Sequence, residues 1–118
     1  KKEKEQHSEK LKSVLDYIGE HYAEPISIAE LAELCYFSEY HFMRFFKSAM
    51  GTSFTSYLSS YRLSMAARLL LLTNNSILDI ALSCGYENLS YFNRIFKKRF
   101  EQTPREYRRR QTPDTVHP

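Results

Sequence analysis

The segment Asn88–Phe100, with the sequence NLSYFNRIFKKRF, mixes aromatic, amide and basic side chains and contains no acidic residue. On a helix, where successive residues are about 100° apart, Phe92, Phe96 and Phe100 share one apolar face. The polar side chains share the opposite face: Ser90, Asn93, Arg94, Lys97 and Lys98. Such side chains donate hydrogen bonds and attract anions. The segment could therefore read DNA, lie on a membrane or form the solvated edge of a small core.

Other kinds of chemistry have little support in the sequence. The two cysteines, Cys35 and Cys84, lie in apolar surroundings and are interpreted as buried thiols of a cytoplasmic protein. The four histidines have neither the mutual spacing nor the cysteine partners of a metal site. The chain also lacks a glycine-rich phosphate loop and a nucleophile motif. We therefore expect no enzymatic activity, no metal and no cofactor.

Charge is distributed unevenly along the 118 residues. Residues 1–51 carry a net charge of −2, residues 52–84 carry +1 and residues 85–118 carry +4. A basic C-terminal third and an overall charge of +3 suit a polyanionic partner. No apolar run approaches the roughly 20 residues that span a bilayer, so no membrane partner is expected.

Apolar residues at helical spacing, together with capping signals, divide the chain into helices. Three segments have the pattern of a capping box at a helix start: Ser27–Glu30, Ser76–Asp79 and Thr103–Glu106. We expect helices over residues 8–22, 27–34, 38–50, 54–72, 76–84, 88–100 and from 103 onwards. Residues 1–7 are expected to be disordered or a linker, and residues 111–118 a tail. Because no strand-like alternation occurs, the predicted fold class is all-α, with about seven helices.

The chain contains an internal repeat. SIAELAELC, which starts at Ser27, aligns with SILDIALSC, which starts at Ser76, at an offset of 49 residues. YHFMRFFK aligns with SYFNRIFK at an offset of 50 residues. Each copy is a short helix, a tight turn and a longer helix, which is the helix-turn-helix layout, as in homeodomain-like folds. The sequence therefore predicts a first subdomain over residues 8–58, a connecting helix over residues 54–72 and a second subdomain over residues 73–110.

The connecting helix sets the spacing that the two copies can reach. Its roughly 19 residues extend over about 28 Å, whereas one turn of B-DNA is about 34 Å. One chain could therefore insert two recognition helices, residues 38–50 and 88–100, into successive major grooves. Because the two reading faces differ in sequence, the target would be asymmetric or a loose direct repeat.

Most of the chain resembles a known family, and the resemblance is most specific in the second copy of the repeat. SILDIALSCGYENLSYFNRIFKKRFEQTPREYRR is similar to the second helix-turn-helix of AraC/XylS family transcription regulators, and the resemblance covers residues 8–110. It implies the C-terminal domain of a bacterial regulator that binds specific double-stranded DNA and activates transcription through RNA polymerase. It also implies a separate N-terminal sensor or dimerisation domain in a longer protein. Glu101 and Tyr36 depart from the family, which commonly has glycine at these turns, so we expect a left-handed strain of ~1–2 kcal/mol there.

Position on the polar faces, together with the resemblance, assigns the side chains expected to read bases. Arginine can clamp the O6 and N7 atoms of guanine, and asparagine can clamp N6 and N7 of adenine. The expected base-reading residues are Tyr40, Met43, Arg44, Leu89, Ser90, Asn93 and Arg94. Alternatives stay open: either arginine could contact phosphate or pair with a glutamate, and Leu89 could be only a hydrophobic staple.

A second set of residues suits the phosphate backbone, where lysines and helix N-termini bind. The expected phosphate contacts are Ser38, His41, Lys47, Asn88, Tyr91, Lys97 and Lys98. Lys98 could equally be solvated, and Arg108–Arg110 could graze phosphate or form a soluble end.

One other function remains possible at this point: a helical protein-interaction or membrane-surface domain without specific DNA reading, although such a domain needs no paired, capped repeat. A DNA-binding domain could in addition contact RNA polymerase or an upstream sensor domain through the acidic side chains of the first helix, which could otherwise form a solvated face. These are Glu9, Asp16, Glu20 and Glu24.

Overall fold

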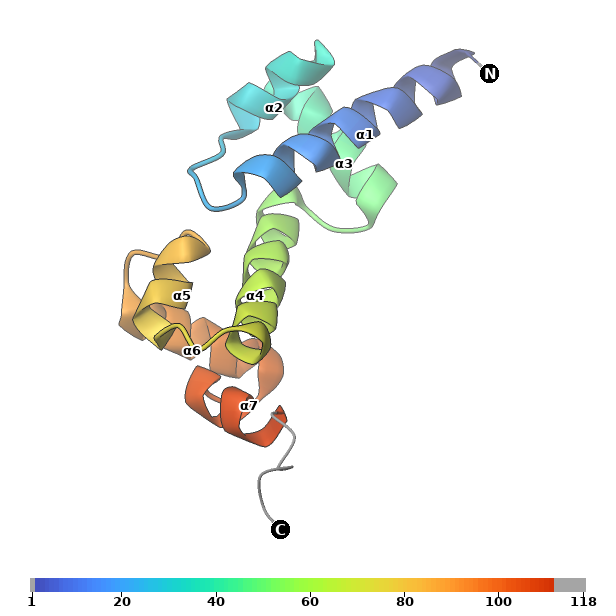
Figure 1. Cartoon of the computed structure of the whole chain (residues 1–118). Coiled ribbons are helices and arrows are strands. Elements are labelled where there is room, and N and C mark those ends of the chain that lie inside the picture. The colour runs from blue at the N-terminus through green and yellow to red at the C-terminus, as the bar shows by residue number, and fades with distance from the viewer. Residues whose placement is uncertain (1, 112–118) are drawn as a thin grey trace. The chain divides into compact units, whose positions relative to one another are not determined.

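The computed structural model of the chain describes residues 2–111 and contains seven α-helices with no strand in that range (Figure 1). The helices are α1 (Lys2–His21), α2 (Ile28–Cys35), α3 (Glu39–Met50), α4 (Phe54–Leu72), α5 (Ile77–Ser83), α6 (Leu89–Phe100) and α7 (Pro104–Gln111). The all-α prediction is confirmed, and the predicted boundaries from α2 to α6 hold to within one residue.

The N-terminal prediction was wrong. Residues 1–7 were expected to be disordered or a linker, but α1 begins at Lys2, six residues before the predicted start. The lysine, glutamate and glutamine of this stretch are good helix formers. Glu3 and Glu5 in the first turn also interact favourably with the positive end of the helix dipole. At the other end, α7 includes Gln111, and the rest of the predicted tail lies outside the described residues.

The chain folds as two compact units, with the boundary between Tyr61 and Arg62, inside α4. The first unit contains α1, α2, α3 and the start of α4. The second contains the rest of α4 with α5, α6 and α7. Each unit has its own core, so each positions its own helix-turn-helix.

The core of the first unit forms where α1, α2 and α3 meet. Its buried members are Val14, Ile18, Leu31, Ala32, Cys35, Phe42, Phe46, Phe54 and Leu58. Phe42 and Phe46 lie one turn apart on α3 and are fully buried. Since burial of each such side chain stabilises the fold by roughly 1.5–3 kcal/mol, the aromatic stripe fixes which face of α3 points outwards.

The second unit repeats this arrangement. Its buried residues include Leu63, Ala66, Leu70, Ile80, Ala81, Cys84, Tyr86, Phe92, Phe96 and Pro104. The ring of Phe96 meets that of Tyr107 at 5.5 Å, edge to face, just as Phe46 meets Tyr57 at 5.4 Å in the first unit. The predicted sequence repeat is therefore a repeat of packing as well.

Side-chain caps start the helices where the sequence predicts. Ser27 and Ser76 each accept a hydrogen bond from the backbone three residues on, at 3.1 and 3.0 Å. Thr103 and Glu106 form a reciprocal box, with bonds of 2.9 and 3.1 Å. Glu30 differs from the prediction, because its carboxylate accepts a hydrogen bond from the hydroxyl of Tyr17 at 3.4 Å.

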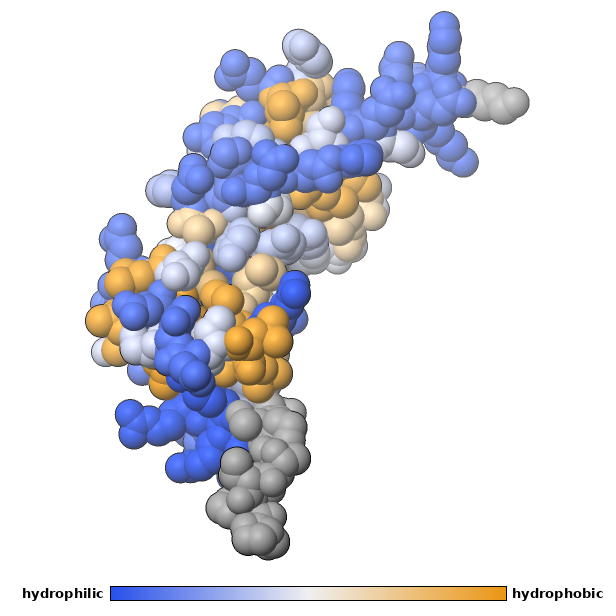
Figure 2. All heavy atoms as spheres, viewed as in Figure 1, coloured by the Kyte–Doolittle hydropathy of each residue, from blue (hydrophilic) through white to orange (hydrophobic). Residues whose placement is uncertain are grey.

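Some apolar side chains of the second unit remain exposed. Figure 2 shows hydrophobic surface over α5 and over the end of α4, where Leu71, Leu72, Leu78 and Leu82 are exposed. In the part of the chain that the structure describes, no helix combines the length and the apolar character needed to cross a bilayer.

Candidate nucleic-acid interface

The turn before each recognition helix has the same backbone path. In the first unit, Tyr36 has φ 59° and ψ 35°, and the amide of Phe37 donates to the carbonyl of Ala32 at 2.9 Å. In the second unit, Gly85 has φ 97°, and the amide of Tyr86 donates to the carbonyl of Ala81 at 2.9 Å. Both turns are therefore closed by a left-handed residue followed by an aromatic one.

Two residues other than glycine adopt the left-handed conformation: Tyr36, with φ 59°, and Glu101, at the C-terminal end of α6, with φ 60°. The left-handed backbone expected at both positions is therefore present. The side chain of Tyr36 is 91% exposed, so little burial compensates for the strained backbone.

Asparagine and serine caps orient the first turn of each recognition helix. The Ser38 hydroxyl accepts a hydrogen bond from the His41 amide at 3.1 Å, and the Asn88 side-chain oxygen accepts one from the Tyr91 amide at 2.9 Å. Both residues were expected to contact phosphate. Their oxygens serve as caps, which leaves the serine hydroxyl proton and the asparagine NH₂ group available as donors.

The outward face of α3 carries the predicted base-reading side chains of the first unit. Tyr40 is 65% exposed and Met43 is 43% exposed, and Arg44 is exposed beside them. The Arg44 Nη1 atom donates to the Tyr40 hydroxyl at 3.0 Å, and its guanidinium carbon lies 5.6 Å from the Tyr40 ring centroid. Sequence reasoning placed both residues on one face but did not anticipate this pairing.

The corresponding face of α6 has a similar arrangement. Ser90 and Arg94 are exposed, whereas Leu89 and Asn93 are partly buried at the edge of the face. The Arg94 guanidinium carbon lies 5.4 Å from the ring centroid of Tyr91, which is 46% exposed. The sequence left a glutamate partner open for either arginine, but among residues 2–111 neither forms such an ion pair, and each lies beside a tyrosine of its own helix.

The remaining predicted phosphate contacts differ in their surroundings. Lys47, Lys97 and Lys98 are exposed on α3 and α6. His41 is also exposed, but its ring stacks on that of Phe37 with centroids 3.9 Å apart, so its orientation is constrained.

Arg108 has a structural role that sequence reasoning missed. Its Nε atom donates to the carbonyl of Leu70 at 2.9 Å, and its Nη2 atom donates to the carbonyl of Thr73 at 3.2 Å. These bonds satisfy carbonyls at the C-terminal end of α4. Of the three arginines in Arg108–Arg110, this one is therefore committed to the fold rather than to phosphate.

The other ionisable groups favour structural roles. Burial raises the pKa of the Cys84 thiol to about 11 and also raises the pKa of Cys35, so neither is a ready nucleophile. Hydrogen bonds from Thr103 lower the pKa of Glu106. Within residues 2–111, no cluster of three potential metal ligands occurs.

Comparison with known proteins agrees with this geometry. A family model described as "Helix-turn-helix domain" matches residues 31–110. The chain is 36% identical over 106 residues to the bifunctional transcriptional activator/DNA repair enzyme AdaA of Bacillus subtilis, covering 90% of this chain and 50% of AdaA. The chain spans half or less of the length of the curated relatives it matches first.

Solved structures show the same fold. A transcriptional regulator from Chromobacterium violaceum, described as containing an AraC-type DNA-binding domain, is 30% identical, with a TM-score of 0.82 over 91% of this chain and 96% of that one. The DNA-binding domain of AdpA, solved in complex with a target DNA, is 28% identical, with a TM-score of 0.81 over 88% of this chain and 96% of that one. The chain therefore belongs to the AraC-type family of helix-turn-helix domains.

Proposed function

We propose that this chain is the sequence-specific, double-stranded DNA-binding domain of a bacterial transcription regulator. The observation that carries the proposal is the duplicated helix-turn-helix, in which both longer helices present an exposed arginine held by a tyrosine. AdpA, whose related domain was solved with its target DNA, supports DNA as the ligand. AdaA is named both as an activator and as a DNA repair enzyme, but this chain spans only half of it, and we carry over DNA binding alone.

In this proposal α3 and α6 are the recognition helices, and they enter successive major grooves. Arg44 and Arg94 donate to guanine, and Asn93 pairs with adenine. The apolar atoms of Tyr40, Met43 and Leu89 pack against thymine methyl groups or the walls of the groove. Lys47 and Lys97 bind phosphates beside each helix. The other predicted phosphate contacts bind the same backbones: Ser38, His41, Asn88, Tyr91 and Lys98.

RNA polymerase, and a further domain in the full-length regulator, are proposed as protein partners in the cytoplasm. The acidic residues of α1, and Glu24 just after it, are a candidate contact, although three of the four have local partners. Asp16 pairs with Lys12 at 2.7 Å, and Glu20 and Glu24 lie 3.9 and 3.3 Å from His21. Charge reversal of Glu9 and Glu20 should then reduce activation at unchanged DNA affinity. Full activation by that variant would remove this face from the proposal.

The proposal is tested by selecting bound duplexes from a randomised DNA pool with the purified domain at moderate salt. We expect enrichment of a site with two unlike elements, centred about one helical turn apart. Enrichment of a single short element would contradict reading by both units. Binding without enrichment would favour a domain that binds DNA without specificity, and no binding would favour a protein-interaction domain, for which the exposed Leu78 and Leu82 offer a surface.

A further inference from the structure

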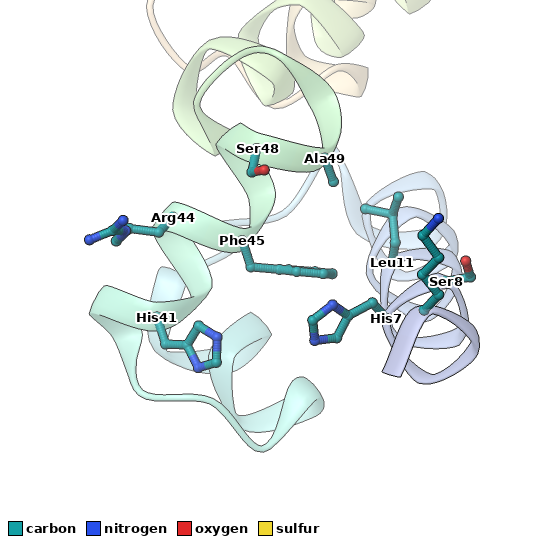
Figure 3. A pocket seen from close by; sticks show the side chains of 9 residues that line it. His7, Ser8, Leu11, His41, Arg44, Phe45, Ser48 and Ala49 are labelled. Atoms are coloured by element: carbon teal, nitrogen blue, oxygen red, sulfur yellow. The ribbon is translucent and has the colours of Figure 1, made fainter. Parts of the chain in front are cut away.

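A cleft lies between the start of α1 and the side of α3, within the first unit. It has a volume of about 590 Å³ and is lined by Lys4, His7, Ser8, Leu11, His41, Arg44, Phe45, Ser48 and Ala49. Figure 3 shows Phe45 extending from α3 towards α1, with His7 and His41 on either side of the opening. Two of the four α1 residues that line the cleft, Lys4 and His7, lie in the segment that the sequence predicted to be disordered or a linker.

Ring contacts hold the two walls of the cleft together. His7 meets Phe45 with centroids 5.4 Å apart and Phe37 with centroids 6.1 Å apart, both edge to face. His41 stacks on Phe37, and the Nζ atom of Lys10 lies 4.3 Å from the centroid of the same ring. The early turns of α1 are therefore anchored to the first recognition helix by side-chain packing.

The cleft combines apolar surface with groups that can bind an anion. Leu11, Phe45 and Ala49 line it together with lysine, arginine, imidazole and hydroxyl groups, and no acidic residue is among its lining residues. Lys4 is exposed and, within the described residues, has no ion-pair partner. Lys12, on another side of the same helix, is paired with Asp16 at 2.7 Å. The glutamates Glu3, Glu5 and Glu9 point to other sides of α1, because they are about 100–140° around the helix from Lys4.

The position of the cleft on α3 indicates which anion it meets. Counting about 100° per residue, the cleft-lining side of α3 is centred roughly 120° around the helix from the side that carries Tyr40, Met43 and Lys47. A major groove is ≈ 12 Å wide, and a helix with its side chains is about 10–12 Å across. When one side of such a helix faces the bases, the adjacent sides face the sugar-phosphate backbones that border the groove.

We propose that the early turns of α1 and the flank of α3 form a phosphate clamp for the DNA backbone beside the groove that α3 reads. This inference rests on the proposed function and extends the DNA interface to a helix outside the helix-turn-helix. Lys4 supplies the charge, and the hydroxyl groups of Ser8 and Ser48 and the ring N–H groups of His7 and His41 supply hydrogen bonds. Arg44 lines the cleft with its stem, and its guanidinium points away from α1 in Figure 3, so its base contact and the clamp are compatible.

The test compares Lys4→Ala with the matched control Lys12→Ala, which removes the same charge from another side of α1. Affinity for the selected duplex is measured as a function of salt by fluorescence anisotropy. Loss of one phosphate contact makes the slope of log K against log salt less negative by about 0.9. The ratio of the wild-type affinity to the Lys4→Ala affinity should therefore fall about 3.5-fold between 50 and 200 mM salt. Lys12→Ala should keep the wild-type slope. Circular dichroism establishes that both variants retain their helices.

A second measurement locates the phosphate. Phosphodiesters bordering the element read by α3 are replaced one at a time with uncharged methylphosphonates, and each duplex is titrated with the wild type and both variants. The account predicts that Lys4→Ala and one or two adjacent replacements are non-additive, as expected for groups in direct contact. Lys12→Ala should be additive with every replacement.

Three outcomes would overturn the clamp, and they are distinguishable. Equal slopes for Lys4→Ala and Lys12→Ala would show that Lys4 contacts no phosphate. Additivity at every phosphate would show that Lys4 acts only through the overall positive electrostatic potential of the protein. Competition by millimolar inorganic phosphate that depends on Lys4 would assign the cleft to a free anion instead. Failure of the wild type to bind any duplex would overturn the proposed function itself.

Discussion

Arg44 donates a hydrogen bond from Nη1 to the hydroxyl oxygen of Tyr40, one helical turn earlier on α3, over 3.0 Å. On α6, the guanidinium of Arg94 lies 5.4 Å from the ring centroid of Tyr91. Each recognition helix therefore holds its exposed arginine against a tyrosine before any ligand binds. Ordering a long side chain in advance reduces the entropy lost on binding, so these pairs favour tight and geometrically specific contacts.

The first prediction concerns this pairing. Tyr40→Phe removes the hydrogen bond but keeps the ring, so affinity for the selected site should fall by roughly 0.5–1.5 kcal/mol. Arg44→Ala should lower it by ~1–3 kcal/mol and relax one base position. Added to Arg44→Ala, the Tyr40→Phe change should have little further effect, because its partner is already gone. A full additional loss in the double variant, measured by anisotropy, would show that Tyr40 acts independently of Arg44.

The second prediction separates phosphate binding from base reading. Lys97→Ala should weaken binding to specific and random duplexes alike and flatten the salt dependence by about 0.9 in slope. Arg94→Ala should instead lose affinity mainly for the specific duplex. If both variants lose the same factor on both duplexes, the division of roles on α6 is incorrect.

The third prediction concerns the left-handed turn at Tyr36. Its backbone has φ 59° and its side chain is 91% exposed, so Tyr36→Gly should raise the free energy of unfolding by about 1 kcal/mol. The matched control is Ala29→Gly, within α2, which should lower the free energy of unfolding by roughly 0.5–1 kcal/mol. Urea denaturation measures both changes. Destabilisation by Tyr36→Gly would mean that the tyrosine ring stabilises the turn by more than the backbone strain costs.

The fourth prediction follows from the capping box of α7. Hydrogen bonds from the Thr103 amide and side chain, and weaker interactions with Arg110 and Lys97, lower the pKa of Glu106 below its ordinary value of 4.5. The folded state therefore binds this proton less readily than the unfolded state. The stabilisation that the ionised Glu106 carboxylate gives to the folded state is fully present above pH 4.5, and it is lost as the pH falls through the lowered pKa of the folded state.

Glu106→Gln isolates this effect, because glutamine retains an acceptor for the Thr103 amide but does not titrate. Thermal unfolding of the wild type and the variant should give midpoints whose difference is constant at neutral pH and narrows below pH 4.5. A difference that stays constant down to pH 3 would show that the carboxylate is not linked to folding.

The fifth prediction concerns the thiols. Burial raises the pKa of Cys84 to about 11, and Cys35 shifts in the same direction, so thiolate is scarce at neutral pH and both sulfur atoms are shielded. Neither thiol should react with iodoacetamide at pH 8 in the folded protein, and both should react in denaturant, as mass spectrometry would show. Rapid labelling of native Cys84 would contradict the packing of the second unit.

Local signals in the sequence were sufficient for most of the fold. Ser27, Ser76 and Thr103 start helices because a cap needs only a side chain and the backbone three residues on, and Gly51 ends α3 in a left-handed conformation. The left-handed turns at Tyr36 and Glu101 were predictable from the family resemblance, which implies glycine at both positions.

What the sequence did not reveal depends on contacts between distant residues. Arg108 bonds to Leu70 and Thr73 across at least 35 positions, and no local pattern signals this choice of partner over phosphate. The early turns of α1 lack large apolar residues, so periodicity gave no signal there. Packing between residues far apart in the sequence, such as His7 on Phe45, places these turns beside α3.

The central claim is that two unlike helices of one chain read two separate DNA elements. Its most direct test is to select bound sites from a randomised pool with Arg44→Ala and with Arg94→Ala, and to compare both profiles with that of the wild type. The account predicts that each variant loses preference at a different position, and that these positions lie about one helical turn apart. Loss at the same position in both variants, or loss in only one of them, would contradict reading by both helices.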